Sequence, residues 1–402
     1  MTDPAPTSSP LLGLPGAVQA EGIDAGVAAH YGNPMIEQRT LAAGSSIVDL
    51  SHRGVLSVAG PDRLTWLNSI ASQELKSLAP GESTEMLLLD PTGRLEYAIR
   101  VLDDGVETWL LIEAAELPGL QKFLDRMKFM LRVQVVDHTL AYATIGAMTD
   151  APATVGIAPA SPNDVPLTWL DPWAQVARGG YQYAETPEHP GTHWTYTETL
   201  VARASLPALR DALAAGTVTV TPTGAAATST VKPAGLLALE ALRIAAWRPR
   251  RAREVDEKSI PHELDWLRTA VHLSKGCYRG QETVAKVHNL GHPPRRLVML
   301  HLDGSEGVLP APGDPVQADR VRPEQEAERV TVGVITSSGI HYELGPIALA
   351  VIKRTIPAAS TLYVASEGIS ISASQEIIVP QSAGSVAEIP RLPRLGIRTP
   401  GH

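Results

Sequence analysis

The residues with the clearest chemical potential form the octapeptide KGCYRGQE, which contains Cys277, the only cysteine among 402 residues. Lys275 and Arg279 lie two positions away on either side. A thiol near fixed positive charge loses its proton more readily, and the thiolate is the reactive form. Gly276 and Gly280 flank the cysteine and give the backbone access to positive φ. This spacing predicts an exposed basic loop with a functional thiol; the alternative is a buried, inert cysteine.

A second candidate group lies on the most helical segment of the sequence, which we expect to run from Pro233 to about Trp247. At helical spacing, Glu240, Arg243 and Trp247 fall on one stripe with Leu236. An acid, a guanidinium and an indole on one face would suit the wall of a cavity for a flat, charged ligand. The alternative is an exposed i,i+3 ion pair beside a half-covered aromatic ring.

Directly after this segment, the run Arg248–Arg253 places four arginines in six residues around a proline. Guanidinium groups bind carboxylates and phosphates in two-point contacts. Arg248 and Arg250 are therefore candidate contacts for an anionic ligand. The alternative is a solvated loop, since charge runs usually lie on the surface.

Other common chemical motifs are absent from the sequence: it has no Walker loop, no GxGxxG and no CxxC. His288 and His292 are four residues apart, but Gly291 and Pro293 disrupt the helix that would align them on a metal. One cysteine cannot supply the four thiolates that usually hold an iron–sulfur cluster. We therefore predict no resident metal, and at most a transient contact of Cys277 with iron.

The elements that must position these residues read as an α+β protein. Apolar runs at 86–89 and 95–101 flank turn residues at 90–94 and predict a hairpin. Further strands are expected at 108–112 and 133–136, around an amphipathic helix over 117–127. Strands interleaved with helices on an antiparallel framework indicate the α+β class.

The two ends of the chain and its last third have a different character. Six short strand-like runs separated by Gly/Pro turns follow residue 293 and predict a small β-barrel. Residues 1–28 lack periodicity and are expected to be a flexible lead, and residues 381–402 a disordered tail. Residues 150–200 carry no pattern that we can interpret.

Composition narrows the class of protein further. A length of 402 residues predicts two or three domains, and 44% hydrophobic residues is ordinary for a globular chain. A single cysteine fits a reducing compartment. No apolar run approaches the roughly 20 residues of a membrane span, and the N-terminus lacks the features of a signal peptide. We expect a cytoplasmic protein without a membrane partner, and a net charge of −9 argues against an extended sheath for nucleic acid.

The octapeptide resembles the signature of the YgfZ family, folate-binding relatives of the glycine-cleavage aminomethyltransferase. The flanking segments LEALRIAAWRPR, EVDEKSIPHEL and ETVAKVHNLGHPPRRLVML resemble the same family. Near the N-terminus, DLSHRGVLSVAGPD is similar to the opening of the aminomethyltransferase-like fold. The resemblance is strong over about residues 232–300, weaker over 45–135, and poor over 150–230 and after 380.

This resemblance implies a multidomain aminomethyltransferase-like fold with a C-terminal β-barrel. It implies a folate-binding core domain built from residues 29–84 and 232–292, which carries the octapeptide. A ferredoxin-like α+β domain is expected at 85–231 and the barrel at 293–380. The implied cofactor is tetrahydrofolate or a derivative, contacted by the residues of the second candidate group and the arginine run: Glu240, Arg243, Trp247, Arg248 and Arg250.

For function, the resemblance implies support of iron–sulfur cluster assembly or repair, and thereby of tRNA modification by radical iron–sulfur enzymes. Cys277 would be the functional thiol. Within the octapeptide, Gln281 and Glu282 are expected to fix the loop by hydrogen bonds, and Tyr278 completes the signature. The partners implied are iron–sulfur proteins and folate.

Two other functions stay open. The aminomethyltransferases that this chain resembles carry paired aspartates in the second strand of the hairpin, where this sequence has Glu96 and Tyr97. Glu96 is a partial substitute, so a folate-dependent one-carbon transferase is the alternative, although an accessory factor fits the replaced acidic pair better. In a third reading, folate is only a structural ligand and the run Arg248–Arg253 contacts tRNA directly.

Overall fold

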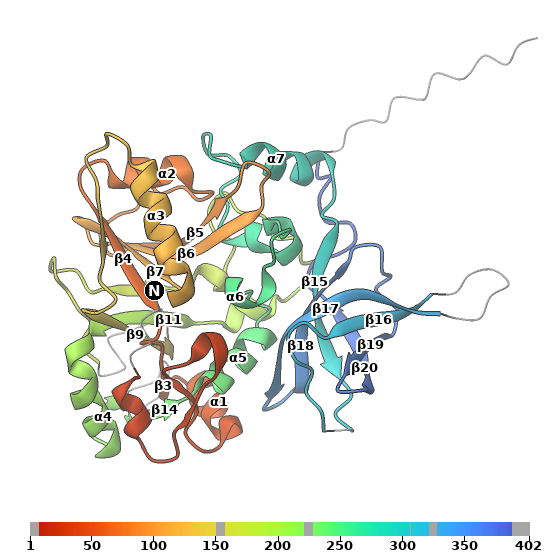
Figure 1. Cartoon of the computed structure of the whole chain (residues 1–402), viewed down its shortest axis with the longest axis horizontal. Coiled ribbons are helices and arrows are strands. Elements are labelled where there is room, and N and C mark those ends of the chain that lie inside the picture. The colour runs from red at the N-terminus through yellow and green to blue at the C-terminus, as the bar shows by residue number, and fades with distance from the viewer. Residues whose placement is uncertain (1–7, 150–156, 221–227, 306, 321–327, 388–402) are drawn as a thin grey trace, which may run out of the picture.

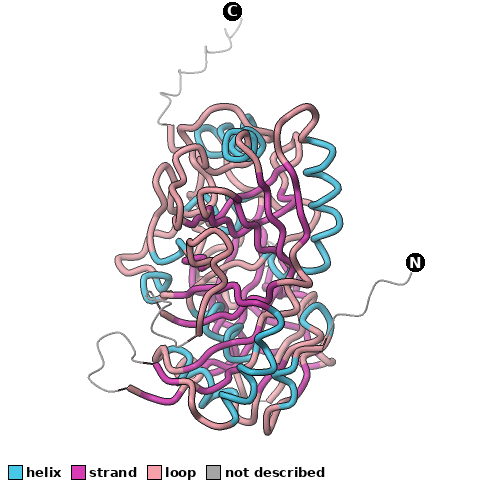
Figure 2. The backbone as a smooth tube through the Cα atoms, turned by 90° about the vertical axis from the view of Figure 1, so that its left-hand side faces the viewer, coloured by secondary structure: helices cyan, strands magenta, loops and turns pink. Residues whose placement is uncertain are grey.

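The computed structural model describes residues 8–149, 157–220, 228–305, 307–320 and 328–387. Two five-stranded sheets lie beside a closed β-barrel, which occupies the right-hand side of Figure 1. In Figure 2, strands run through the middle of the molecule and several helices lie at its edges. No helix in these ranges is long and apolar enough to cross a membrane. Because helices occur beside sheets whose strands are mostly antiparallel, the fold class is α+β, as predicted.

The first sheet has the antiparallel strand order β5-β6-β7-β4-β8 and contains the predicted hairpin. At the turn between β5 and β6, Gly93 has φ +82°. Helix α3 covers one face, because its apolar stripe, including Leu120 and Leu124, packs on Leu56 and Val58 of β4. The elements are β4 (Gly54–Ala59), α2 (Arg63–Ile70), β5 (Ser83–Leu89), β6 (Leu95–Asp103), β7 (Glu107–Ile112), α3 (Leu117–Met127) and β8 (Gln134–Asp137).

The second sheet has the order β10-β11-β9-β3-β14, in which β14 and β3 are parallel. This pairing corrects one prediction: Pro233 lies in β14, so helix α5 begins at Leu236 rather than at Pro233. The elements are α1 (Pro34–Ala42), β3 (Ser46–Asp49), β9 (Tyr142–Met148), β10 (Thr168–Leu170), β11 (Tyr196–Ala202), α4 (Leu206–Ala214), β14 (Lys232–Ala234), α5 (Leu236–Ala245), α6 (Arg251–Glu254) and, in a small ribbon, β12 (Thr219–Val220) and β13 (Ser229–Thr230).

The barrel closes in the strand order β15-β18-β17-β16-β19-β20, and the six predicted strand runs all lie in it. Helix α5 packs against β17 and α1, so it joins the barrel to the second sheet. Helix α7, whose first two residues are the last two of the octapeptide, precedes the barrel in the chain. These elements are α7 (Gln281–Leu290), β15 (Arg295–Leu302), β16 (Pro315–Arg320), β17 (Glu328–His341), β18 (Gly345–Lys353), β19 (Leu362–Ser366) and β20 (Ile369–Ile377).

The domain boundaries expected at 84/85 and 231/232 do not follow the sheets. Strand β4 pairs with β7 across the first boundary, which also cuts β5. Strands β9 to β11 belong with β3 and not with the hairpin. Residues 85–231 thus contribute β6, β7 and β8 to the first sheet and β9, β10 and β11 to the second, so they do not form one ferredoxin-like unit.

The expectation of a flexible lead is wrong for residues 8–28; residues 1–7 lie outside the described residues. A 3-10 turn spans Pro10–Gly13, and β1 (Val18–Gln19) pairs with β2 (Ala28–His30). Leu11 and Val27 are buried. These pieces are two to four residues long, too short for periodicity to register, and tertiary contacts hold them.

The expected disordered tail is likewise ordered where it is described, over residues 381–387. The amides of Val386 and Ala387 donate to the carbonyls of His288 and Asn289 at 2.9 and 3.1 Å. This segment therefore satisfies the last carbonyls of α7, which a helix leaves without partners of its own. Residues 388–402 lie outside the described residues.

Candidate functional site

The octapeptide loop lies between the end of α2 and the turn of the β5–β6 hairpin and contacts both. The Lys275 ammonium donates hydrogen bonds to the carbonyls of Asn68, Ala71 and Gln73 at 2.6–2.7 Å. A cation suits the carbonyl end of a helix, where the macrodipole is negative. Burial lowers the pKa of Lys275 to about 8, so the ammonium persists at neutral pH. Lys275 therefore anchors the loop to the end of α2.

The two glycines of the octapeptide have different roles. Gly280 has φ +84°, and a Cβ at this position would lie 2.7 Å from the carbonyl oxygen of Asp90 and 3.0 Å from the Cα of Gly93. Gly280 thus permits both the backbone conformation and the contact with the hairpin turn. Gly276 has no positive φ and open space around it, so the prediction of positive φ is wrong for this residue.

Cys277 is exposed, as the exposed-loop prediction requires. The cations expected to activate it have other partners, because Lys275 is held by carbonyls and Arg279 donates to Glu96 at 2.9 Å. Of the two residues expected to fix the loop, Gln281 donates to the carbonyl of Lys275 at 3.2 Å, whereas Glu282 is exposed and its carboxylate accepts no hydrogen bond from the described residues.

Tyr278, the one aromatic residue of the signature, is buried, with the Lys275 ammonium 5.3 Å from its ring centroid. The ring and the ammonium together fill the space on the inner side of the loop. The thiol of Cys277 is therefore carried by a loop that is fixed at several points.

A second group of predicted residues lines a central cavity between α5 and the two sheets. Glu240, Arg243, Arg248 and Arg250 all contribute to it, although they come from a helix and from the segment after it. Trp247 does not line this cavity. It follows the end of α5 with φ +59°, and its ring packs edge-on against His189. The helical stripe therefore predicted the acid and the guanidinium but not the position of the indole.

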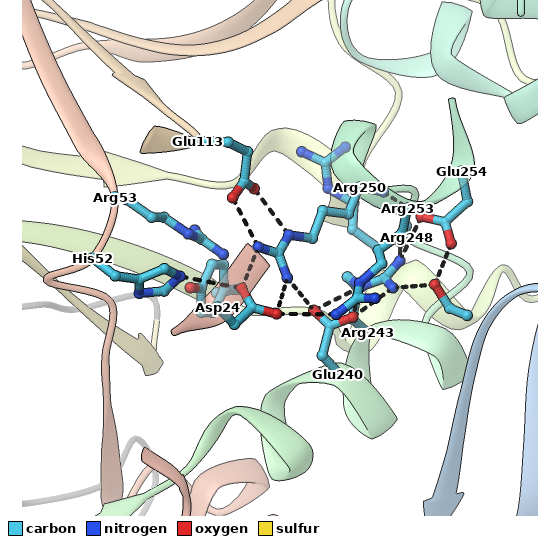
Figure 3. Close-up of polar contacts among 12 residues, drawn as sticks. Asp24, His52, Arg53, Glu113, Glu240, Arg243, Arg248, Arg250, Arg253 and Glu254 are labelled. Carbon is cyan, nitrogen blue, oxygen red and sulfur yellow. Dashed lines mark hydrogen bonds and ion pairs between the residues drawn. The ribbon is translucent and has the colours of Figure 1, made fainter. Parts of the chain in front are cut away.

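Buried ion pairs connect the arginines of this cavity (Figure 3). Arg250 donates to Glu113 at 2.8 and 2.9 Å, to Asp24 at 2.7 Å and to Glu240 at 3.3 Å. Arg243 bonds Glu240 at 2.7 Å and Glu254 at 2.9 Å. The Glu240–Arg243 pair is thus buried, and the alternative of an exposed pair is wrong.

The solvated-loop alternative for the arginine run is also wrong for Arg248 and Arg250, which are 6% and 3% exposed. Arg248 donates to Glu85 at 2.6 Å and to Asp171 at 3.0 Å. These carboxylates lie far away in sequence, so the arginine run alone could not reveal them. A direct tRNA contact by these two side chains would require them to leave their partners.

Neighbouring cationic side chains lower the pKa values of two carboxyl groups in this network, Asp24 and Glu113. Burial alone would raise the pKa of Asp24, but His52 and Arg250 outweigh it and hold that pKa well below its ordinary value. Burial would likewise raise the pKa of Glu113, and Arg250 and Arg53 hold it low. Both carboxylates are therefore ionised wherever the protein is folded at ordinary pH.

Asp24, His52 and Glu113 also place ligand atoms within 4.8 Å of one another, which is a possible geometry for a metal. The guanidinium of Arg250 is hydrogen-bonded to both carboxylates and already supplies the countercharge. This cluster is therefore an ion-pair centre rather than a metal centre.

The central cavity has a volume of only about 40 Å³ with these ion pairs in place. Small-molecule sites usually measure about 300–1,000 Å³. A pterin ring does not fit beside the side chains as they lie, and the space suits ordered water.

Sequence reasoning missed several residues of this cavity. Arg53 and Glu198 form a buried pair at 2.5 Å, and each retains one polar atom without a partner among the described residues. Trp194 and Tyr196, from the stretch without a readable pattern, complete the wall. Arg53 lies in the DLSHRG segment, whose resemblance to the opening of the aminomethyltransferase-like fold could have identified it. No sequence pattern identified Tyr196 or Glu198 of β11.

Glu96 lies outside this cavity, in an open groove of about 550 Å³ between the hairpin turn, α3 and α6. We call this the outer groove. Tyr97 and Phe123 also line it, and Arg279 of the octapeptide reaches its edge by bonding Glu96. The expected catalytic carboxylate is thus ion-paired at the surface.

Comparisons with known proteins agree with this fold. No protein-family model matches the chain. It is 24% identical over 375 residues to a putative chloroplastic transferase of Arabidopsis thaliana, covering 87% of this chain and 72% of that one. It is 25% identical over 364 residues to an aminomethyltransferase of Streptomyces avermitilis, covering 86% and 88%.

A mitochondrial protein of Mycosarcoma maydis, named iron-sulfur cluster assembly factor IBA57 homolog, is 25% identical over 274 residues. The match covers 63% of this chain and little more than half, 56%, of that relative. The crystal structure of aminomethyltransferase T of the glycine cleavage system from Bartonella henselae superposes with a TM-score of 0.68 at 17% identity, over 94% of this chain and 98% of that one. The fold is therefore aminomethyltransferase-like, as the resemblance implied.

Proposed function

We propose that this protein is an accessory factor for the assembly or repair of iron–sulfur clusters, with Cys277 as its functional thiol. The observation that carries the proposal is the exposure of the single cysteine on a loop anchored by Lys275 and Gly280. The names of the fungal and bacterial relatives support it, since they include both a cluster assembly factor and aminomethyltransferases. Its partners would be iron–sulfur proteins, among them radical enzymes that modify tRNA, in the cytoplasm.

Within this function, Cys277 would act as a transient ligand of cluster iron or in thiol exchange with a partner. A single thiol suffices for a shared, short-lived ligand but not for a resident cluster. The anchored loop would keep the sulfur at a fixed place on the surface, which reduces the conformational freedom lost when a partner docks.

The test is complementation of a strain that lacks this protein, read by the activity of a cluster-dependent enzyme. We expect Cys277→Ser to fail and Ser274→Ala, another change at a single side-chain atom three residues away, to succeed. Full activity with Cys277→Ser would remove the thiol from the function.

We further propose that the protein binds tetrahydrofolate or a derivative at the central cavity, through Glu240, Arg243, Arg248 and Arg250. Because the cavity of about 40 Å³ is filled by ion pairs, binding requires pairs such as Arg248–Glu85 to part. Trp194 and Trp266 line the cavity, so occupancy should quench tryptophan fluorescence. A titration with tetrahydrofolate should show quenching and a rise in Tm that Arg243→Ala abolishes, and no change with wild-type protein would reject folate binding.

The second candidate function is a folate-dependent aminomethyltransferase that uses Glu96. Its support is the fold and the position of Glu96 on β6. Against it, the carboxylate of Glu96 is bound by Arg279 at 2.9 Å rather than directed to the central cavity. Formation of methylene-tetrahydrofolate from an aminomethyl donor, lost in Glu96→Gln, would establish this activity, and no turnover above the blank would exclude it.

A further inference from the structure

The outer groove has a floor and walls that suit an extended, negatively charged ligand. Tyr97 and Phe123 form its floor, with ring centroids 6.4 Å apart. The guanidinium of Arg126 lies 5.9 Å from the Phe123 ring, and that of Arg251 lies 5.8 Å from the Tyr97 ring. Guanidinium groups held over aromatic faces keep their hydrogen-bond donors available at the edge of the ring.

The charges that face this groove are unequal. Arg94, Lys122 and Arg126 form no ion pair within the described part of the chain, and Glu257 is a lining carboxylate in the same situation. Of the other lining charges, Glu96 and Arg251 have partners, while Asp90 bonds only neutral groups of its own turn and keeps its charge. With four cationic and three anionic side chains in its lining, the groove is locally positive by one charge on a chain of net charge −9. Such a contrast steers an acidic partner to this place and away from the rest of the surface.

The helical side of the groove continues into an exposed apolar tip. Gly119, Lys122 and Arg126 present one face of α3 over about 10 Å, which matches about three residues of extended chain. One turn beyond, Phe129 and Met130 are 87% and 84% exposed, and Phe129 has φ +44°. Two neighbouring large apolar side chains in water favour contact with a protein chain over a compact small molecule.

The groove also lies next to the functional loop. Arg279 bonds Glu96 at the groove and places its guanidinium 5.9 Å from the Phe123 ring. Only one residue separates Arg279 from Cys277, so their Cα atoms are at most about 7 Å apart. A chain held in the groove therefore lies beside the guanidinium of Arg279, a residue of the loop that carries the thiol.

We propose that the outer groove docks an extended acidic segment of a partner protein, and that docking places the partner beside Cys277. The proposal rests on the proposed function and specifies the chemistry of its partner: carboxylates over Lys122 and Arg126, with apolar side chains over the tip.

The binding test uses a fluorescein-labelled decapeptide of alternating Glu and Ser, with a Lys–Ser peptide as control, and is read by anisotropy. We expect saturable binding of the acidic peptide that weakens as salt screens the charges. Lys122→Glu/Arg126→Glu should weaken it about tenfold or more. The matched control is Lys232→Glu/Lys353→Glu, which makes the same change of charge at exposed lysines of β14 and β18 and should bind as wild type does.

The proximity test uses the same peptide with a terminal pyridyl disulfide. The Cys277 thiolate attacks the peptide sulfur, a new disulfide joins peptide and protein, and pyridine-2-thione leaves after taking up a proton. We expect faster exchange than with a Gln–Ser peptide carrying the same disulfide, and no such difference in Lys122→Glu/Arg126→Glu.

Absence of acidic-peptide binding at low salt, or equal binding by both double variants, would overturn the proposal. So would equal exchange rates for the acidic and neutral peptides. Much tighter binding of tetra-γ-glutamate than of the peptide would assign the groove to a small-molecule tail instead. Both tests use purified protein without cluster enzymes, so their outcome is separate from that of the Cys277→Ser complementation.

Discussion

The two glycines of the octapeptide should respond in opposite ways to replacement by alanine. Gly280→Ala places a methyl group 2.7 Å from the Asp90 carbonyl oxygen and 3.0 Å from the Cβ of Leu89, at φ +84°. The neighbouring atoms are backbone or the first carbon of a side chain, so they cannot rotate away. Gly276→Ala meets no atom within 4 Å and needs no positive φ.

The magnitudes follow from these contacts. A non-glycine residue in the left-handed region costs about 1–2 kcal/mol, and overpacking against rigid neighbours adds about 1–3 kcal/mol. We expect Gly280→Ala to reduce the free energy of unfolding by about 2–5 kcal/mol. Gly276→Ala should leave it unchanged or raise it by up to about 1 kcal/mol, because alanine restricts the unfolded chain.

The assay is urea denaturation of both variants and the wild type, followed by far-UV circular dichroism, with the m-values compared to verify a common unfolded state. Modification of Cys277 by a neutral thiol reagent adds a local readout, since a displaced hairpin turn should change its rate in Gly280→Ala only. Equal stability of the two variants would refute the claim that Gly280, and not Gly276, sets the conformation of the loop.

Three further predictions concern the charged groups. Arg250→Met leaves buried carboxylates without their countercharge and should cost about 3–5 kcal/mol at pH 7, whereas Arg253→Met, at the edge of the same network, should cost about 1 kcal/mol or less; chemical denaturation measures both. Burial lowers the pKa of His262 to about 4 from the ordinary 6.5. Between these pH values the unfolded chain binds more protons than the folded protein, so the free energy of unfolding should fall as pH drops from 6.5 to 4, by on the order of 3 kcal/mol. Thermal melts across this pH range should show a flatter dependence for His262→Gln. Lys275→Met removes three hydrogen bonds at the end of α2 and should cost about 1–3 kcal/mol; a melting temperature equal to that of wild type would contradict the anchoring role.

Local patterns predicted much of the architecture. The barrel strands and the hairpin were readable because each combines an apolar run with turn residues, and the information lies within a few positions. The turn at 90–94 has the predicted chemistry, with the side chain of Asp90 accepting from the amides of Thr92 and Arg94. Helix α3 shows the same agreement between stripe and burial.

The candidate site was predicted less completely, because its electrostatics depend on distant residues. Arg250 lies 226 residues from Asp24 and 137 from Glu113, so the sequence predicted an anion site or a solvated loop but could not reveal these carboxylate partners. Trp247 was assigned to a helical stripe, yet the helix ends at Ala245 and a positive φ turns the ring elsewhere. The octapeptide predicted an exposed thiol. It did not predict that Lys275 anchors the loop to the end of α2 or that Arg279 bonds Glu96 at the outer groove.

The contact between residues 386–387 and the end of α7 has a consequence for biosynthesis. Translation delivers α7 about a hundred residues before the amides that cap it. A nascent chain therefore exposes the last carbonyls of this helix to solvent until residues 386–387 have been added and have folded back. A molecule truncated before residue 386 would lack these two hydrogen bonds, so the end of the helix behind its thiol loop would fray.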